Sequence, residues 1–165
     1  MNYLLQGFGV FLGVIAGTAV TILTQRFLLW RQEKQKVQNL KFEIQFNIKQ
    51  IDRWIEYLRR YRDAVNGDTL ASWAEYFDFS HVIKSTIENM IQTGLIYKKL
   101  PDDSVSHLLL FISSFNLGSE SVINQQILNQ RQRFNKQLAV MEITVWEKKL
   151  QENRKNLEAI AKVLS

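Results

Sequence analysis

An uncharged stretch at the N-terminal end of the sequence constrains the fold more than any other feature. It runs from Leu4 to Gln25, about 22 residues, and as an α-helix it would be roughly 33 Å long. That length crosses the hydrocarbon core of a bilayer, and apolar side chains surround the whole helix instead of forming one stripe. We therefore predict a transmembrane anchor over residues 1–30, followed by a domain over residues 31–165.

Two other interpretations of this stretch fit less well. A secretory signal peptide would begin with basic residues and end at a small-residue cleavage site. Here the three residues before Leu4 carry no charge, and the stretch ends in Thr24-Gln25-Arg26. A buried helix of a soluble protein is the second alternative, although apolar residues on all sides favour lipid over a protein core.

Basic residues flank the predicted anchor on one side only, namely Arg26, Arg31, Lys34 and Lys36. The positive-inside rule then places the N-terminus outside and the domain in the cytoplasm, with the chain in the inner (plasma) membrane as a single-pass protein. These four residues are the predicted contacts with lipid headgroups. The chain has no cysteine, which suits a reducing cytoplasm, and a periplasmic domain is the alternative.

Small and polar residues share one side of the predicted membrane helix. They are Gln6, Gly9, Gly13, Gly17, Thr21 and Thr24. Glycines four residues apart let two backbones approach closely, and glutamine or threonine can hydrogen-bond between helices. This face therefore predicts a homo-oligomer formed through the transmembrane helix. A narrow pore lined by the same residues is one alternative, and the general abundance of glycine in membrane helices is another.

The net charge of +5 is concentrated beside the anchor. Residues 26–66 contain ten Lys and Arg and five Asp and Glu, whereas residues 67–165 contain eleven of each. Such an excess favours anionic lipid headgroups, at about 1 kcal/mol per basic residue near the surface. A nucleic-acid-binding domain would need a basic face on its distal part, so the distribution argues against nucleic acid as a partner.

The remaining sequence predicts an all-α fold. An amphipathic stripe recurs every three or four residues through a long membrane-proximal helix over residues 31–65, so the transmembrane helix is expected to continue into a cytoplasmic bundle of three to five helices. The stripe consists of Val37, Leu40, Ile44, Ile48, Ile51, Ile55 and Leu58. We further predict helices over residues 69–93, with a break near residues 78–80 and Gly94 at the end, and over residues 103–134.

The last helix has the most regular pattern. Ile143, Leu150, Leu157 and Leu164 repeat every seven residues, with Trp146, Asn153 and Ile160 in the companion positions. This is a coiled-coil type of seam, and a polar Asn within such a seam fixes its register. Packing inside one bundle and dimerisation both explain the repeat, and we favour packing inside the bundle.

Residues suited to catalysis or metal binding are scarce. The chain has two histidines, and neither the P-loop nor the dinucleotide-binding glycine motif occurs. Asp78 and His81 are spaced as an acid/base or metal pair, although a capping cluster at a helix start explains them more simply. Arg59-Arg60-x-Arg62 could hold a phosphate, although a solvated helix face has the same composition. We therefore predict a protein that is not an enzyme and has no metal or cofactor.

Two motifs cover under a fifth of the chain: E-I-x-x-N-x-x-x-I at residues 43–51 and G-L-I-x-x-x-L-P at residues 94–101. In these motifs and in its layout the chain resembles a group of small bacterial membrane proteins with an N-terminal anchor and a helical cytosolic module. Some of them are accessory membrane effectors of RNA-guided anti-phage defence systems, and their oligomers form pores. The pore-forming members have an Arg/His motif that this chain lacks, so no functional residue is carried over.

Together these patterns predict a non-enzymatic, self-associating membrane protein whose cytoplasmic bundle is an interaction or scaffold module. Its expected partners are membrane lipids and further copies of itself. A cytoplasmic protein is an additional candidate partner. The alternative function is an oligomeric pore-forming membrane effector in antiviral defence.

Overall fold

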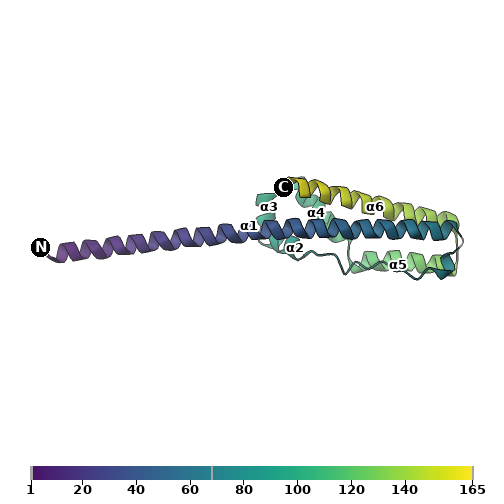
Figure 1. Ribbon diagram of the computed structural model, residues 1–165, viewed down its shortest axis with the longest axis horizontal. Coiled ribbons are helices and arrows are strands. Elements are labelled where there is room, and N and C mark those ends of the chain that lie inside the picture. The colour runs from purple at the N-terminus through teal and green to yellow at the C-terminus, as the bar shows by residue number, and fades with distance from the viewer. Residues whose placement is uncertain (1, 68, 165) are drawn as a thin grey trace. The chain divides into compact units, whose positions relative to one another are not determined.

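The computed structural model describes residues 2–67 and 69–164, with side chains described from residue 13 onward. The described chain consists of six α-helices and one short 3-10 helix, without strands, which confirms the predicted all-α fold and helical bundle (Figure 1).

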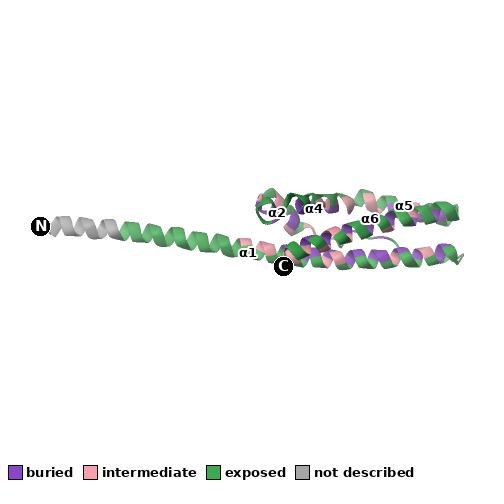
Figure 2. Ribbon diagram, turned by 90° about the horizontal axis from the view of Figure 1, so that it is seen from above, coloured by how far each residue is buried: buried purple, intermediate pink, exposed green. Residues whose placement is uncertain are grey.

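The first helix, α1, spans Asn2–Asn66 without a break. Neither proline nor glycine occurs between residues 18 and 66, so nothing interrupts its backbone hydrogen bonds. The chain divides into two units, Met1–Gln38 and Asn39–Ser165. In the first unit the described side chains are mainly exposed, whereas in the second α1 has a buried side, as Figure 2 shows by colour. The second unit is the helical bundle.

The segment after α1 differs from its prediction. A helix was expected over residues 69–93 with a break near residues 78–80. The structure instead has a 3-10 helix, η1 (Leu70–Ser72), then residues 73–84 without helix, and only then α2 (Ser85–Gln92). We call residues 73–84 the strap. Within it Phe77 and Phe79 are buried while their neighbours Tyr76, Asp78 and Ser80 are exposed. This alternation is the period-two pattern of an extended segment, and it was overlooked in the sequence.

A left-handed glycine separates α2 from α3 (Leu95–Lys99). Gly94 has φ 68°, a conformation that a side chain disfavours, and this confirms its predicted place at the end of the preceding helix. Pro101 then precedes α4 (Asp102–Ser114), and its fixed φ suits the start of a helix. Leu95, Ile96 and Leu100 are buried, so this short connection closes one end of the core.

The helix predicted over residues 103–134 is two helices, α4 and α5 (Leu117–Gln132), with the break at Phe115 and Asn116. The Asn116 side chain accepts a hydrogen bond from the Ser119 N–H at 2.8 Å and so caps α5. At the other side of the break, the Lys84 ammonium donates to the carbonyls of Phe115 and Ile112 at the end of α4. Gly118 lies in the first turn of α5.

The last helix, α6 (Lys136–Val163), runs antiparallel to the bundle part of α1 (Figures 1 and 2). Arg62 lies 2.5 Å from Glu147, and Arg154 lies 2.6 Å from Asp52. The predicted seam packs inside the bundle. Its buried members are Ile143, Trp146, Leu150, Asn153, Leu157 and Ile160.

Aromatic rings form the centre of the core. Trp54 on α1 lies 4.7 Å from Phe79 of the strap and 5.2 Å from Phe115, ring centroid to ring centroid. Phe79 and Phe115 are also 5.2 Å apart, and Phe111 of α4 lies 5.0 Å from Phe115. The cluster therefore joins α1, the strap and α4. The predicted stripe on α1 supplies further core residues, namely Leu40, Ile44, Ile51, Ile55 and Leu58, whereas Val37 and Ile48 are only partly buried.

Candidate functional site

The apolar part of α1 is the first candidate site. Among the described residues, one helix is long and apolar enough to cross a membrane, and no part of its apolar window is buried inside the protein. Val20, Leu23 and Leu29 expose 60–66% of their surface. Exposed leucine and valine in such density are costly in water and favourable in lipid.

The small and polar face lies on this part of α1. A methyl group added at Gly13 or Gly17 would meet no other atom within 4 Å, so both backbones are open to an approaching helix. The Thr21 hydroxyl donates to the Gly17 carbonyl at 2.9 Å, which satisfies it within its own helix. Gln6 and Gly9 lie outside the residues whose side chains are described. Thr24 is exposed on the same face.

Aromatic rings accompany the predicted lipid-contacting residues. The Arg31 guanidinium lies 5.8 Å from the ring centre of Phe27, and the Lys34 ammonium lies 5.4 Å from that of Trp30. Arg26 is exposed and Lys36 is partly buried. Aromatic rings beside basic groups are typical of the membrane–water interface, where the ring is partly buried and the charge meets the headgroups.

Two helices bind the strap or the start of α2 with the same residue pair, Glu followed four residues later by Asn. On α1, Asn47 forms two hydrogen bonds with the backbone of Ile83, accepting from its N–H at 3.0 Å and donating to its carbonyl at 2.7 Å. On the same helix the Glu43 carboxylate accepts from the Thr86 N–H at 2.8 Å and so caps α2. These are the Glu and Asn of the motif at residues 43–51, which the sequence alone could not assign to a role.

The second pair lies on α5. Asn124 accepts from the Phe77 N–H and donates to the Phe77 carbonyl, both at 2.8 Å. Glu120 accepts from the Phe79 N–H at 2.7 Å. Sequence analysis missed this pair, although its spacing repeats that of Glu43 and Asn47 and could have indicated a shared role. In a β-sheet, a neighbouring strand pairs with the backbone N–H and carbonyl of an extended segment. Here an asparagine side-chain amide pairs with them instead.

The Asp78–His81 pair is located on the outer side of the strap. Asp78 accepts from the Ser80 N–H at 2.8 Å, and His81 Nδ1 lies 3.2 Å from its other oxygen. The hydrogen bonds from Ser80 lower the pKa of Asp78, with a smaller contribution from His81. The pair stabilises a turn. The expected role, capping the start of a helix, is therefore wrong. Within the described residues, no group of three or more His, Cys, Asp or Glu could hold a metal.

The arginines at residues 59–62 each have a carboxylate partner. Arg59 lies 3.4 Å from Glu56, Arg60 lies 2.8 Å from Glu75, and Arg62 pairs with Glu147. Since these partners neutralise the guanidinium groups, the cluster offers no ready phosphate site. The solvated helix face, which was the simpler interpretation, fits the structure.

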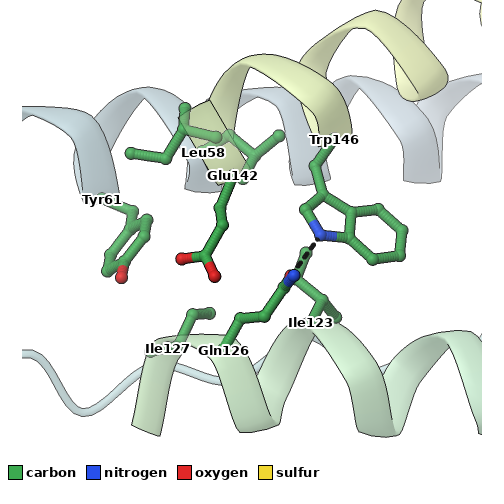
Figure 3. A pocket seen from close by; sticks show the side chains of 8 residues that line it. Leu58, Tyr61, Ile123, Gln126, Ile127, Glu142 and Trp146 are labelled. Atoms are coloured by element: carbon green, nitrogen blue, oxygen red, sulfur yellow. Dashed lines mark hydrogen bonds between the residues drawn. The ribbon is translucent and has the colours of Figure 1, made fainter. Parts of the chain in front are cut away.

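A cavity of about 10 Å³ lies between α1, α5 and α6, lined by residues that include Tyr61, Gln126, Glu142 and Trp146 (Figure 3). The Trp146 indole N–H donates to Gln126 at 2.7 Å, and Gln130 donates to Glu142 at 3.0 Å. The Tyr61 hydroxyl is buried and has no hydrogen-bond partner among the described residues. Burial, and to a lesser degree the charge of Glu142, raises the pKa of Tyr61 to about 12.

Tyr61→Phe should change how stability depends on alkaline pH. The pKa of about 12 in the folded state exceeds the unfolded value of 10.0, so the unfolded chain ionises first and stability falls as pH rises through this window. The loss should be roughly 1 kcal/mol per pH unit. Denaturant unfolding of the full chain in mild detergent at pH 9, 10.5 and 11.5 should show a shallower decline for the variant.

At neutral pH the same change should cost no stability, because the hydroxyl makes no hydrogen bond that would be lost. Tyr97→Phe is the matched control, since Tyr97 is 55% exposed. If Tyr97→Phe flattened the pH profile as much as Tyr61→Phe, burial at the cavity would not be the cause.

Comparison with models of protein families, with curated proteins and with solved structures found no match.

Proposed function

We propose that this chain is a non-enzymatic, single-pass membrane protein that self-associates through α1 and presents its helical bundle as an interaction or scaffold module. The N-terminus lies outside the inner (plasma) membrane and the bundle lies in the cytoplasm. Arg26, Arg31, Lys34 and Lys36 contact lipid headgroups.

The observation that carries the proposal is the open glycine face on an exposed apolar helix. Lipid solvates leucine and valine as well as another helix does, so membrane helices associate where small residues permit close packing. Gly13 and Gly17 have that open space. The orientation is supported by the basic residues on the C-terminal side of the apolar segment, with their aromatic neighbours.

An exposed apolar face on α6 supports a scaffold role for the bundle. Leu138, Met141 and Val145 follow each other at three and four residues and expose 40%, 58% and 61% of their surface. They lie on the side of α6 away from the buried seam. Clustered apolar residues on a surface are typical of protein interaction sites.

Gly17→Leu should weaken self-association of the full chain by at least about tenfold, or about 1.4 kcal/mol, because the added side chain separates the two backbones. Chemical cross-linking in native membranes and sizing in mild detergent would measure this. Ala19→Leu adds a comparable side chain about 160° away around the helix and should leave the oligomer intact. Only monomer in the unmodified chain, or equal effects of both variants, would contradict self-association through this face.

An oligomeric pore in antiviral defence is the second candidate, because Thr21 and Thr24 place polar groups on the same face and Gln6 shares their register in the sequence. The hydrogen bond from Thr21 to Gly17 favours the packed interface, since that hydroxyl is satisfied without water. A membrane-potential dye separates the two. The packed oligomer predicts no depolarisation on expression, whereas depolarisation lost in Gly17→Leu and kept in Ala19→Leu would favour the pore.

A further inference from the structure

The strap is attached to the bundle in an unusual way. Among the described residues, the hydrogen bonds that join its backbone to α1 and α5 all run to side chains, those of Asn47, Asn124 and Glu120. Helices keep their own backbone hydrogen bonds whether or not the strap is in place. The strap can therefore leave without breaking a backbone hydrogen bond of α1 or α5.

Two phenylalanines anchor the strap. Phe77 and Phe79 are 2% and 5% exposed, and the intervening Asp78 points outward. Phe77 packs edge-on against Tyr57 of α1 at 6.2 Å, and Phe79 packs against Trp54 and Phe115. Figure 1 shows the strap as a thin coil that leaves the far end of α1 and returns toward α2. It thus occupies a groove between α1 and α5.

The strap is not enclosed on all sides. A hollow of about 360 Å³ lies beside it, lined on the strap side by Phe79, Ser80, Val82 and Lys84 and on the other by residues 115–117 and Glu120. Tyr76, Asp78 and Ser80 face outward. The strap therefore borders open space between itself and the start of α5.

We propose that the groove between α1 and α5 is a peptide-binding site that the strap occupies in cis. Its trans partner is an extended protein segment with two aromatic residues separated by one other residue. The aromatic floor (Trp54, Tyr57 and Phe115) receives the two rings. Asn124 and Glu120 then bind the backbone at those two residues, and Asn47 binds it further along. This inference does not depend on self-association of α1.

The chemistry of the partner follows from that of the strap. An asparagine amide pairs with a backbone N–H and carbonyl whatever the side chain of that residue. Asn47 and Asn124 therefore select an extended backbone and not a particular side chain. The two buried rings are separated by one residue because alternate side chains of an extended segment share a face. Binding in trans requires release of the strap, so the apparent affinity is reduced by the fraction of molecules in which the groove is open.

A complementation experiment tests the proposal. The double substitution Phe77→Ser and Phe79→Ser should release the strap, and the full chain in mild detergent should then bind a synthetic peptide of residues 74–84. Fluorescence anisotropy should show binding at least about tenfold tighter than to the unmodified chain. The same peptide with both Phe replaced by Ser should not bind.

Failure of the double variant to keep its helical circular dichroism would overturn the proposal, because the helices would then depend on the strap. A folded double variant that does not bind the peptide would also overturn the proposal.

Hydrogen exchange in the unmodified chain adds an independent measure. The amides of Phe77, Phe79 and Ile83 should exchange at least about tenfold faster than the buried amides in the middle of α6. Asn124→Ala should accelerate them further, while Asn129→Ala, at an exposed position of the same helix, should not. Equal exchange of strap and α6 in both variants would show that the strap opens only when the bundle unfolds, which would refute a releasable occupant.

Discussion

Ile51→Asp should unfold the helical bundle while the apolar part of α1 stays helical. Ile51 is 0% exposed in the middle of the buried side of α1. A buried, unpaired carboxylate costs several kcal/mol, and the lost burial of isoleucine adds about 1.5–3 kcal/mol. Since small domains are stable by only about 5–15 kcal/mol, the two losses together remove most of the margin. Far-UV circular dichroism and limited proteolysis of the full chain in mild detergent would measure the loss.

Phe42→Asp is the control for Ile51→Asp. It also introduces a carboxylate in place of an apolar residue on α1, but Phe42 is 63% exposed. We expect its thermal midpoint to stay within a few degrees of the unmodified chain. A folded, protease-resistant Ile51→Asp protein would show that this side of α1 is not the core.

The amphipathic helices were predictable from the sequence because the spacing of their apolar residues alone indicates which side is buried. The apolar stripe on α1 recurs every three or four residues, and Leu150 and Leu157 on α6 belong to a repeat of seven. A helix must bury such a stripe. Gly94 was predictable for a different reason, since a single residue without a side chain marks a left-handed turn.

The strap was not predictable in the same way. Its backbone is satisfied by Asn47 and Asn124, which are 36 and 47 residues away from their partners in the chain. A local pattern cannot reveal such long-range bonds, so the residues around Phe77 and Phe79 were predicted as no more than a short break within a helix. The break at Phe115 was missed because it contains neither proline nor glycine. Asn116, a favourable helix cap, was a local signal for it.

For the candidate membrane site, the sequence predicted which residues share a face of the helix but not what packs against that face. The spacing of Gly13, Gly17 and Thr21 places them on one face of any helix. The structure adds that the two glycines are open and that the Thr21 hydroxyl donates to the Gly17 carbonyl of the same helix. What occupies the face depends on a second helix, which the sequence of one chain does not specify.

Trp54→Ala should destabilise the bundle by about 3–5 kcal/mol, the second largest effect expected of a single substitution. The Trp54 ring is 3% exposed and lies against both Phe79 and Phe115, so its removal leaves a cavity where α1, the strap and α4 meet. Thermal unfolding followed by circular dichroism should show the midpoint fall by at least about 10 °C. Because Phe79 loses the ring it packs against, we expect hydrogen exchange to rise first in the strap and only then in the helices.

Trp30→Ala is the matched control, because it is the same substitution at a ring that is 57% exposed and lies in the N-terminal unit. It should leave the bundle's midpoint unchanged. Equal midpoints for the two variants would mean that the aromatic cluster does not hold the bundle together. A large loss of stability with uniform hydrogen exchange across the strap and the helices would show that Trp54 is a core residue. It would also show that the strap does not open independently of the helices. The two readouts therefore separate the energetic role of this cluster from its role in retaining the strap.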